Sequence, residues 1–245
     1  VTHAPPWRQS PGFAADPVSG DLLLQGGAGH HDTWAWDGRA WTELSPASLS
    51  PEGPLSMVAD PATLTLVALS VGTGPSAAGT WSWDGSAWTH LASRPPAPGP
   101  VAYDPAARRV VSLIDAPEGA PDEQTWAFDG ATWARVATPD QVAVEFYSSA
   151  SGVPDQMAAD FTTRSVVYVE QAAVSPDYLI PGSTFVLAAG AWSHPPASIP
   201  LEHQGLLVAR APAGRPVLLI PPATGAAPDI WRWTGAQWTP SAPAR

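Results

Sequence analysis

The residues best suited to chemistry in this sequence are carboxylates and histidines that lie between its regular segments. Glu52 and Glu202 occupy equivalent positions just before two apolar segments, and His203 follows Glu202 directly. Two carboxylates that flank one bond can act as general acid and base in glycoside hydrolysis. The same groups can bind a cation through oxygen ligands or remain solvated charges, and the sequence leaves all three open. The candidate catalytic residues are Glu52, Glu145, Glu202 and His203.

A wider set of polar and aromatic side chains is expected to contact a ligand. Tyrosines in long irregular stretches offer an apolar ring together with a hydrogen-bonding hydroxyl. The candidate ligand-binding residues are Arg8, Glu52, Glu145, Tyr147, Asp155, Tyr178, Glu202 and His203.

Metal and nucleophile chemistry have little support. The chain has no Cys, which excludes disulfides, thiol catalysis and thiolate metal sites. His30 and His31 are the only metal candidates, but neighbouring side chains of an extended segment point to opposite sides. Asp32 is interpreted as a turn residue, because other repeats carry unrelated residues at its position. No phosphate-binding glycine loop and no Ser-His-Asp pattern is present, and we expect no cofactor.

These residues must be positioned by a repeat that occurs five times. Its first copy is Thr33-Trp34-Ala35-Trp36-Asp37-Gly38 followed by Trp41. Asp-Gly between alternating aromatic segments predicts a hairpin with a two-residue type I′ loop. In that register Trp36 faces Arg39 and Trp34 faces Trp41. The first aromatic residues of the five copies, all expected in equivalent buried positions, are Trp34, Trp81, Trp126, Phe185 and Trp231.

Each hairpin is preceded by two further apolar segments, the first of which ends in an Asp-Pro turn in three copies. Four strands per repeat and a period of about 45 residues are typical of propeller blades. We therefore predict an all-β, five-bladed propeller of four-stranded antiparallel blades closed into one ring, with no helix. The predicted parts are an arm at 1–12, a single propeller at 13–240 with blades near 13–45, 56–92, 100–137, 156–194 and 206–240, and a tail at 241–245.

The connections of the predicted blades differ between their two ends. Short turns join the first strand to the second and the third to the fourth, at one end of the blade. The connections at the other end are longer, above all around the fourth repeat. Long loops on a rigid scaffold commonly carry binding and catalysis. We therefore expect function at the long-loop end.

Charge narrows the choice of partners. The formal net charge is −11, all eleven basic residues are Arg, and Lys is absent. Nucleic acid and anionic membrane surfaces are poor partners for such a chain. No apolar run is long enough to cross a membrane. We expect a monomer that binds protein or carbohydrate, from a secreted or cell-surface bacterial protein.

The order of Asp-Pro turn, apolar strand, Gly26-Gly27 and Thr-Trp-x-Trp-Asp-Gly-x-x-Trp resembles the bacterial kelch-type repeats of the galactose-oxidase central-domain superfamily. The resemblance covers nearly the whole chain and implies a kelch-like propeller. Kelch propellers usually have six or seven blades, so five is a departure. Of the arginines that the family places eight positions before the first-strand Asp, only Arg8 is present, and copper-radical chemistry would need a Cys.

Three functions remain in view. The sequence favours a binding module that acts through the long-loop end. The alternative is a hydrolase or lyase with carboxylates at the mouth of the central channel. The third is a structural spacer, suggested by the Pro- and Ala-rich tail.

Overall fold

The computed structural model describes most of the chain. The described residues are 4–44, 49–71, 78–95, 99–114, 124–136, 156–169, 173–174, 179–180, 183–196, 206–208, 214–220 and 229–241. Within these ranges every regular element is a β-strand and none is a helix, as the sequence predicts.

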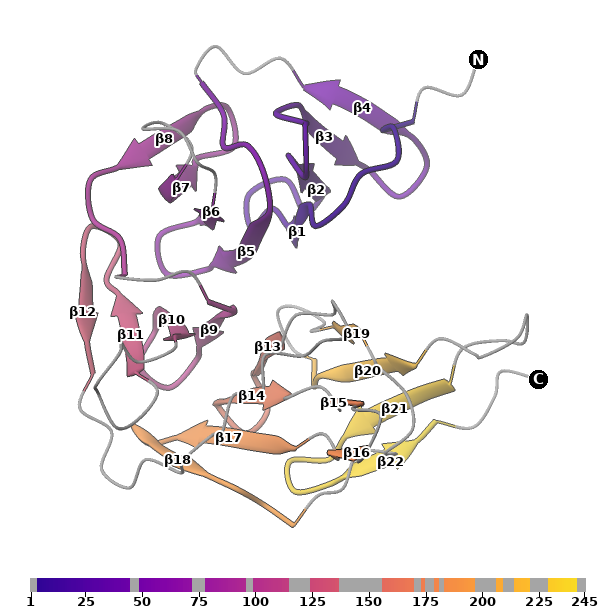
Figure 1. Cartoon of the computed structure of the whole chain (residues 1–245), viewed down its shortest axis with the longest axis vertical. Helices are drawn as coiled ribbons and strands as arrows, with labels where there is room; N and C mark the ends of the chain where they lie inside the picture. Colours follow the sequence, from indigo (N-terminus) through magenta and orange to yellow (C-terminus); the bar gives the residue numbers. More distant parts are fainter. Residues whose placement is uncertain are drawn as a thin grey trace. The chain divides into compact units, whose positions relative to one another are not determined.

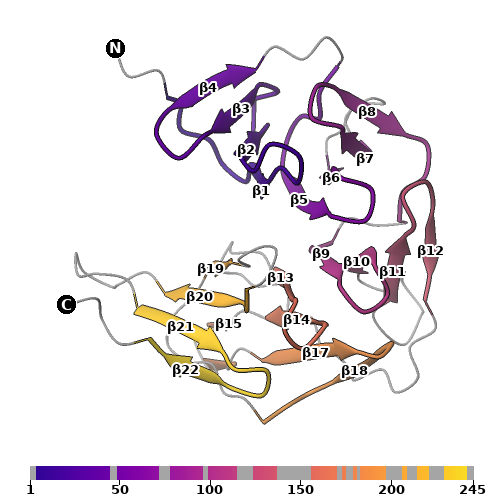
Figure 2. The ribbon, with the colours of Figure 1, turned by 180° about the vertical axis from the view of Figure 1, so that it is seen from behind.

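Five sheets of four antiparallel strands follow one another along the chain, and each has its strands in chain order (Figures 1 and 2). Blade 1 consists of β1 (Gly12–Ala15), β2 (Leu22–Gln25), β3 (Thr33–Trp36) and β4 (Trp41–Leu44). Blade 2 consists of β5 (Leu55–Asp60), β6 (Thr65–Val71), β7 (Ala78–Trp83) and β8 (Trp88–Leu91). Blade 3 consists of β9 (Val101–Asp104), β10 (Arg109–Ile114), β11 (Gln124–Phe128) and β12 (Trp133–Arg135).

Blade 4 consists of β13 (Gln156–Asp160), β14 (Ser165–Val169), β17 (Thr184–Ala188) and β18 (Ala191–Ser193). Blade 5 consists of β19 (Leu206–Val208), β20 (Val217–Ile220), β21 (Asp229–Trp233) and β22 (Trp238–Pro240). A small extra hairpin, β15 (Ala173–Val174) with β16 (Leu179–Ile180), lies between β14 and β17 in the chain. The predicted class, all-β with five four-stranded propeller-type blades, is confirmed.

The chain forms two compact units. Unit 1 comprises residues 1–103, 109–114 and 126–136, and unit 2 comprises residues 104–108, 115–125 and 137–245. Blades 1 and 2 belong to unit 1 and blades 4 and 5 to unit 2, while residues of blade 3 contribute to both.

The hairpin register differs from the prediction. Trp36 pairs with Trp41, and Trp34 pairs with Glu43. The two central loop residues are Gly38 and Arg39, of which only Gly38 has a positive φ, at 95°. This is the pattern of a type II′ turn and not of type I′. Because the error is two residues, each aromatic ring keeps its predicted face of the sheet.

The Asp of each Asp-Gly pair explains the register. Asp37 Oδ1 accepts hydrogen bonds from the backbone N–H groups of Arg39 and Ala40, at 2.7 and 2.8 Å. These bonds, with that of Ala40 the largest cause, lower the pKa of the Asp37 carboxyl. Asp37 is therefore the residue just before the two-residue loop, and its carboxylate closes that loop. Gly38 then takes the first of the two central positions. Asp84 and Asp129 do the same in blades 2 and 3.

Blade 4 has no Asp-Gly pair and forms the loop that was predicted for the others. Ala188 pairs with Ala191, and the two residues between them, Ala189 and Gly190, both have positive φ, at 51° and 82°. Two positive φ values in a two-residue loop are the pattern of a type I′ turn.

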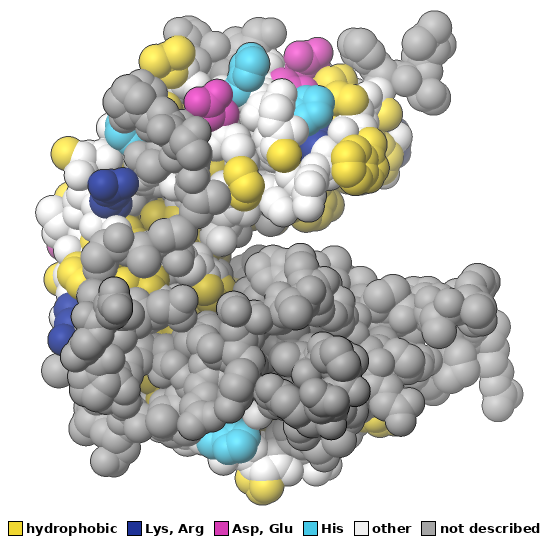
Figure 3. All heavy atoms as spheres, in the orientation of Figure 1, with side chains coloured by type: hydrophobic (Ala, Val, Ile, Leu, Met, Phe, Trp, Pro, Cys, Tyr) yellow, Lys and Arg dark blue, Asp and Glu magenta, His cyan; other side chains and the backbone are white. Residues whose placement is uncertain are grey.

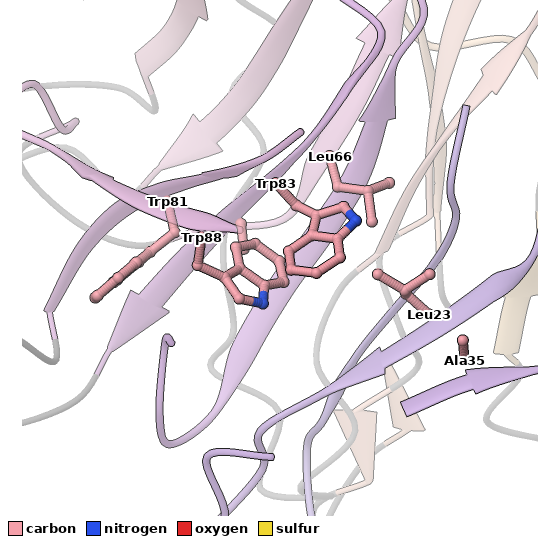
Figure 4. Close-up of a cluster of buried hydrophobic side chains, with 7 residues drawn as sticks. Leu23, Ala35, Leu66, Trp81, Trp83 and Trp88 are labelled. Atoms are coloured by element: carbon pink, nitrogen blue, oxygen red, sulfur yellow. The ribbon is translucent and has the colours of Figure 1, made fainter. Parts of the chain in front are cut away.

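In blades 2 and 5 the aromatic pair of the hairpin packs on the preceding blade. In unit 1, Trp81, Trp83 and Trp88 form one buried cluster with Leu23 and Ala35 of blade 1 (Figure 4). The Trp83 and Trp88 rings lie 5.3 Å apart between centroids. In unit 2, Trp233 and Trp238 pack in the same way with residues of blade 4. This burial is the main source of cohesion between successive blades.

A hydrogen bond accompanies this packing at four successive blades. The indole Nε1–H of a Trp in the fourth strand donates to a Thr hydroxyl in the third strand of the preceding blade. Both groups are buried in every case, so each bond gives a buried indole N–H a hydrogen-bond acceptor. The pairs are Trp88 to Thr33 at 3.1 Å, Trp133 to Thr80 at 2.9 Å, Trp192 to Thr125 at 2.8 Å and Trp238 to Thr184 at 3.0 Å.

Three of the five first aromatic residues are buried as predicted, namely Trp34, Trp81 and Phe185. The expectation is wrong for Trp126 and Trp231, which are half-buried. The residues opposite on the fourth strand differ between these positions. A histidine ring covers Trp81 and Phe185, whereas Trp231 lies opposite Pro240 and Trp126 opposite Arg135.

Candidate functional site

The best-defined candidate site lies in unit 1, at the end of blade 1 that carries the longer connections. Three segments meet there: the arm before β1, the β2–β3 loop, and the segment that leads into β5. Backbone hydrogen bonds join them, from Ala28 N to Gln9 O at 2.9 Å and from Gly27 N to Gly53 O at 3.0 Å. The β1–β2 and β3–β4 turns lie at the opposite end of the sheet.

Glycine makes this junction possible. Gly27 has φ of 101°, and a Cβ at this position would lie 3.0 Å from Gln9 O and 3.2 Å from Arg8 Cβ. A side chain at this position would therefore strain the backbone and push the arm away from the β2–β3 loop. The double glycine after β2 is the sequence feature that lets the arm approach.

Arg8 ties the arm to blade 1. Its guanidinium binds the Asp32 carboxylate through two parallel bonds, Nη1 to Oδ1 at 2.7 Å and Nη2 to Oδ2 at 2.9 Å. Nη1 also donates to Gly26 O at 3.1 Å. The Arg8 side chain is 3% exposed and that of Asp32 is 22% exposed. Paired, two-pronged arginine–carboxylate bonds fix both partners in orientation.

The environment keeps Asp32 ionised. Partial burial raises the pKa of its carboxyl, but the hydrogen bonds from Arg8 and from Trp34 Nε1, with the Arg8 charge, outweigh burial and lower the pKa to about 2. The Trp34 Nε1 to Asp32 Oδ2 distance is 2.5 Å. Asp32, interpreted from sequence as a turn residue, is therefore the centre of an ion pair that holds the arm.

A buried network lies beneath this junction. Gln25 accepts a hydrogen bond from Thr33 and donates through Nε2 to Pro51 O at 2.7 Å and His31 O at 3.3 Å. Thr33 in turn accepts from Trp88 of blade 2. Since Gln25 and Thr33 are both fully buried, the network fixes the loop ends to the sheets on which they rest.

The structure describes four of the sequence-predicted site residues. Glu52 and His31 have exposed side chains, and His30 is half-buried with Nδ1 3.9 Å from Asp32 Oδ1. The Arg8 guanidinium binds the Asp32 carboxylate, and this contact holds the arm. That Arg8 also contacts a ligand stays a prediction. The others lie outside the described residues: Glu145, Tyr147, Asp155, Tyr178, Glu202 and His203.

Sequence reasoning missed Trp7. Its side chain is 86% exposed, and it precedes Arg8 on the anchored arm. The signal was available, because Trp7 is the only Trp of the chain that lies outside the five hairpin repeats. Acidic and histidine side chains gather over the N-terminal blades on the face seen in Figure 3. The joined segments thus carry an exposed aromatic ring, Trp7, and the exposed polar side chains of His31 and Glu52.

Metal binding finds no support in the described part of the chain, where no three His, Cys, Asp or Glu side chains come together to hold an ion. None of the described residues forms a helix that could cross a membrane.

No protein-family model and no curated protein matches this chain. Among solved structures, it is similar to the GH74 xyloglucanase from Xanthomonas campestris, at 17% identity and a TM-score of 0.47, over 95% of this chain and 38% of that one. It is also similar to the SapL1 lectin in complex with alpha methyl fucoside, at 13% identity and a TM-score of 0.44, over 98% of both chains. The chain thus spans well under half of the xyloglucanase. Both TM-scores are below 0.5, so the fold assignment rests on this chain's own strand order.

Proposed function

We propose that this protein is a binding module whose ligand, a protein or a carbohydrate, contacts the long-loop end of the blades. The observation that carries the proposal is the braced junction of the arm, the β2–β3 loop and the segment before β5. The Arg8–Asp32 pair and the Gln25 network hold the backbone in place, while the side chains of Trp7, His31 and Glu52 remain exposed.

Rigid loops with exposed aromatic and polar side chains favour binding, because little conformational entropy is lost when a ligand settles on them. The opposite end of blade 1 has only the compact β1–β2 and β3–β4 turns. The Asp16 and Asp37 side chains there are engaged in closing those turns, as the bond from Val18 N to Asp16 Oδ1 at 2.9 Å illustrates. Catalysis stays a prediction, since only Glu52 of the four candidate catalytic residues is described.

The absence of Cys from the sequence allows a direct test. Glu52→Cys and Asp21→Cys place single thiols at the two opposite ends of blade 1, each with loss of one negative charge. Each variant is coupled to a maleimide polyethylene glycol and applied to an array of glycans and synthetic peptides, beside the unmodified protein. We expect the polymer at position 52 to abolish the array signals and the polymer at position 21 to leave them unchanged. The reverse pattern, or equal retention by both, contradicts the proposal.

A further inference from the structure

Trp7 stands apart from the other tryptophans of the chain. All thirteen lie in the described residues. Twelve belong to the hairpin repeats and are buried or half-buried, whereas Trp7 is 86% exposed. Tryptophan is enriched at protein interfaces and among the residues that dominate binding, so an exposed Trp in a protein that otherwise covers its tryptophans is a candidate contact residue.

The backbone beneath this ring is fixed. Arg8 is anchored by the bonds to Asp32 and Gly26 and also donates through Nε to Pro6 O at 3.2 Å. Gln9 O accepts from Ala28 N, and Ser10 O accepts from Leu55 N at 3.1 Å. An indole on such a segment is held out to solvent and loses little freedom on contact.

Charge selects the ligand chemistry. Arg8 is the cation nearest to Trp7 in the chain, and its charge is balanced by Asp32. Glu52 is exposed and directly precedes Gly53, whose carbonyl accepts a hydrogen bond from Gly27 N. Gly27 in turn lies against Arg8. The whole chain carries a net charge of −11 with no Lys. An indole face attracts cations through its quadrupole, and Trp does so better than the other aromatic residues.

We propose that Trp7 is a cation–π platform for an arginine or lysine side chain of a basic protein segment, with Glu52 as the neighbouring acidic partner. The inference rests on the proposed function, because it names the ligand chemistry of the same end of the blades. A negatively charged surface also speeds the approach of a basic segment and makes its association sensitive to salt.

The test uses a fluorescein-labelled oligo-arginine peptide and the full chain in fluorescence anisotropy. We expect binding that weakens about tenfold in Trp7→Ala and about two- to fivefold in Glu52→Gln, while Trp7→Phe retains part of the affinity. Val18→Ala is the matched control, since Val18 is also an exposed apolar residue but lies in the β1–β2 turn at the opposite end. It should bind as the wild type does. Unchanged thermal midpoints would show that all variants are folded.

Two outcomes overturn the inference. If Trp7→Ala binds the peptide as tightly as the wild type, the attraction is unspecific and Trp7 is not the platform. If the peptide fails to bind while cellohexaose binds in a Trp7-dependent manner, the platform takes sugar rings and not cations. If the polymer-coupled Glu52→Cys variant loses peptide binding while Trp7→Ala keeps it, the Trp7 platform alone is refuted. If both variants keep peptide binding, the proposed function is refuted as well.

Discussion

At the scale of single residues, this protein depends on a few side chains that hold distant segments together. Arg8 and Asp32 are 24 positions apart and meet in a two-pronged ion pair. Breaking a buried pair by removing one partner costs about 3–5 kcal/mol, because the other charge is left uncompensated. The partial exposure of Asp32 places this pair at the lower end of that range.

We therefore expect Arg8→Ala to lower the free energy of unfolding by about 3 kcal/mol, measured by urea denaturation. Arg39→Ala is the control, since Arg39 is exposed in the β3–β4 turn. Equal midpoints for the two variants would show that the ion pair contributes nothing to stability.

The same pair makes a defined contribution to the acid response. The pKa of Asp32 is lowered from 3.8 to about 2 in the folded protein, so the pair adds stability above pH 3.8 that is lost as the pH falls towards 2. A shift of this size corresponds to about 2 kcal/mol, which solvent screening at a partly exposed carboxyl reduces to about 1 kcal/mol. The stability of Asp32→Asn should therefore fall less than that of the wild type between pH 5 and pH 2. Parallel curves of unfolding free energy against pH for Asp32→Asn and the wild type would contradict this prediction.

At the scale of elements, an Asp closes the hairpin loop in blades 1 to 3, and in blades 2 and 5 the aromatic pair packs on the preceding blade. The hydrogen bond from Trp to Thr links a blade to the preceding one, and it appears with the same atoms at four places. Blade 5 has Ile230 where the other four blades have the acceptor Thr.

Removing one acceptor tests the role of this bond. Thr80→Val keeps the shape of the side chain but leaves Trp133 Nε1 buried without its partner, which should cost about 1–3 kcal/mol. Thr42→Val, on the exposed side of β4, makes the same chemical change outside the contact. Chemical denaturation should separate the two variants, and a similar loss in both would mean that the bond is unimportant.

The aromatic pair should matter more than the hydrogen bond. Trp83 is 2% exposed and sits at the centre of the cluster that joins blades 1 and 2 (Figure 4). We expect Trp83→Ala to cost roughly 3–5 kcal/mol, whereas Trp7→Ala should have almost no effect on stability because its ring is in solvent. Paired urea melts of the two variants check this, and a shared midpoint would speak against the core assignment.

At the scale of the whole molecule, five four-stranded blades in two compact units form the scaffold, and their closure into one ring stays a prediction. A net charge of −11 disfavours self-association through mutual repulsion. We expect light scattering after size exclusion to give the monomer mass of 25.5 kDa. A dimer mass at micromolar concentration would show that this chain covers part of its surface with a second copy.

The sequence alone determined the features that depend on local chemistry. Alternation with a period of two placed the aromatic rings of each hairpin on one face, and the recurring Asp-Pro and Asp-Gly pairs located the turns. The hairpin register escaped prediction because Asp37 binds the N–H groups of Arg39 and Ala40 and so shifts the loop by one position on each strand.

Only the tertiary structure decided which distant groups meet. Thr33 and Trp88 are 55 positions apart, and each sits in an ordinary strand pattern that does not indicate its partner. Arg8 matched a family position, yet its bond to Asp32 depends on a close approach of the arm that Gly27 allows. The place of Trp7 outside the five hairpin repeats sets it apart in the sequence, but only packing shows that its ring is exposed while the other twelve tryptophans are covered. Burial and long-range pairing are properties of the assembled blades, and they decide which side chains remain free to bind.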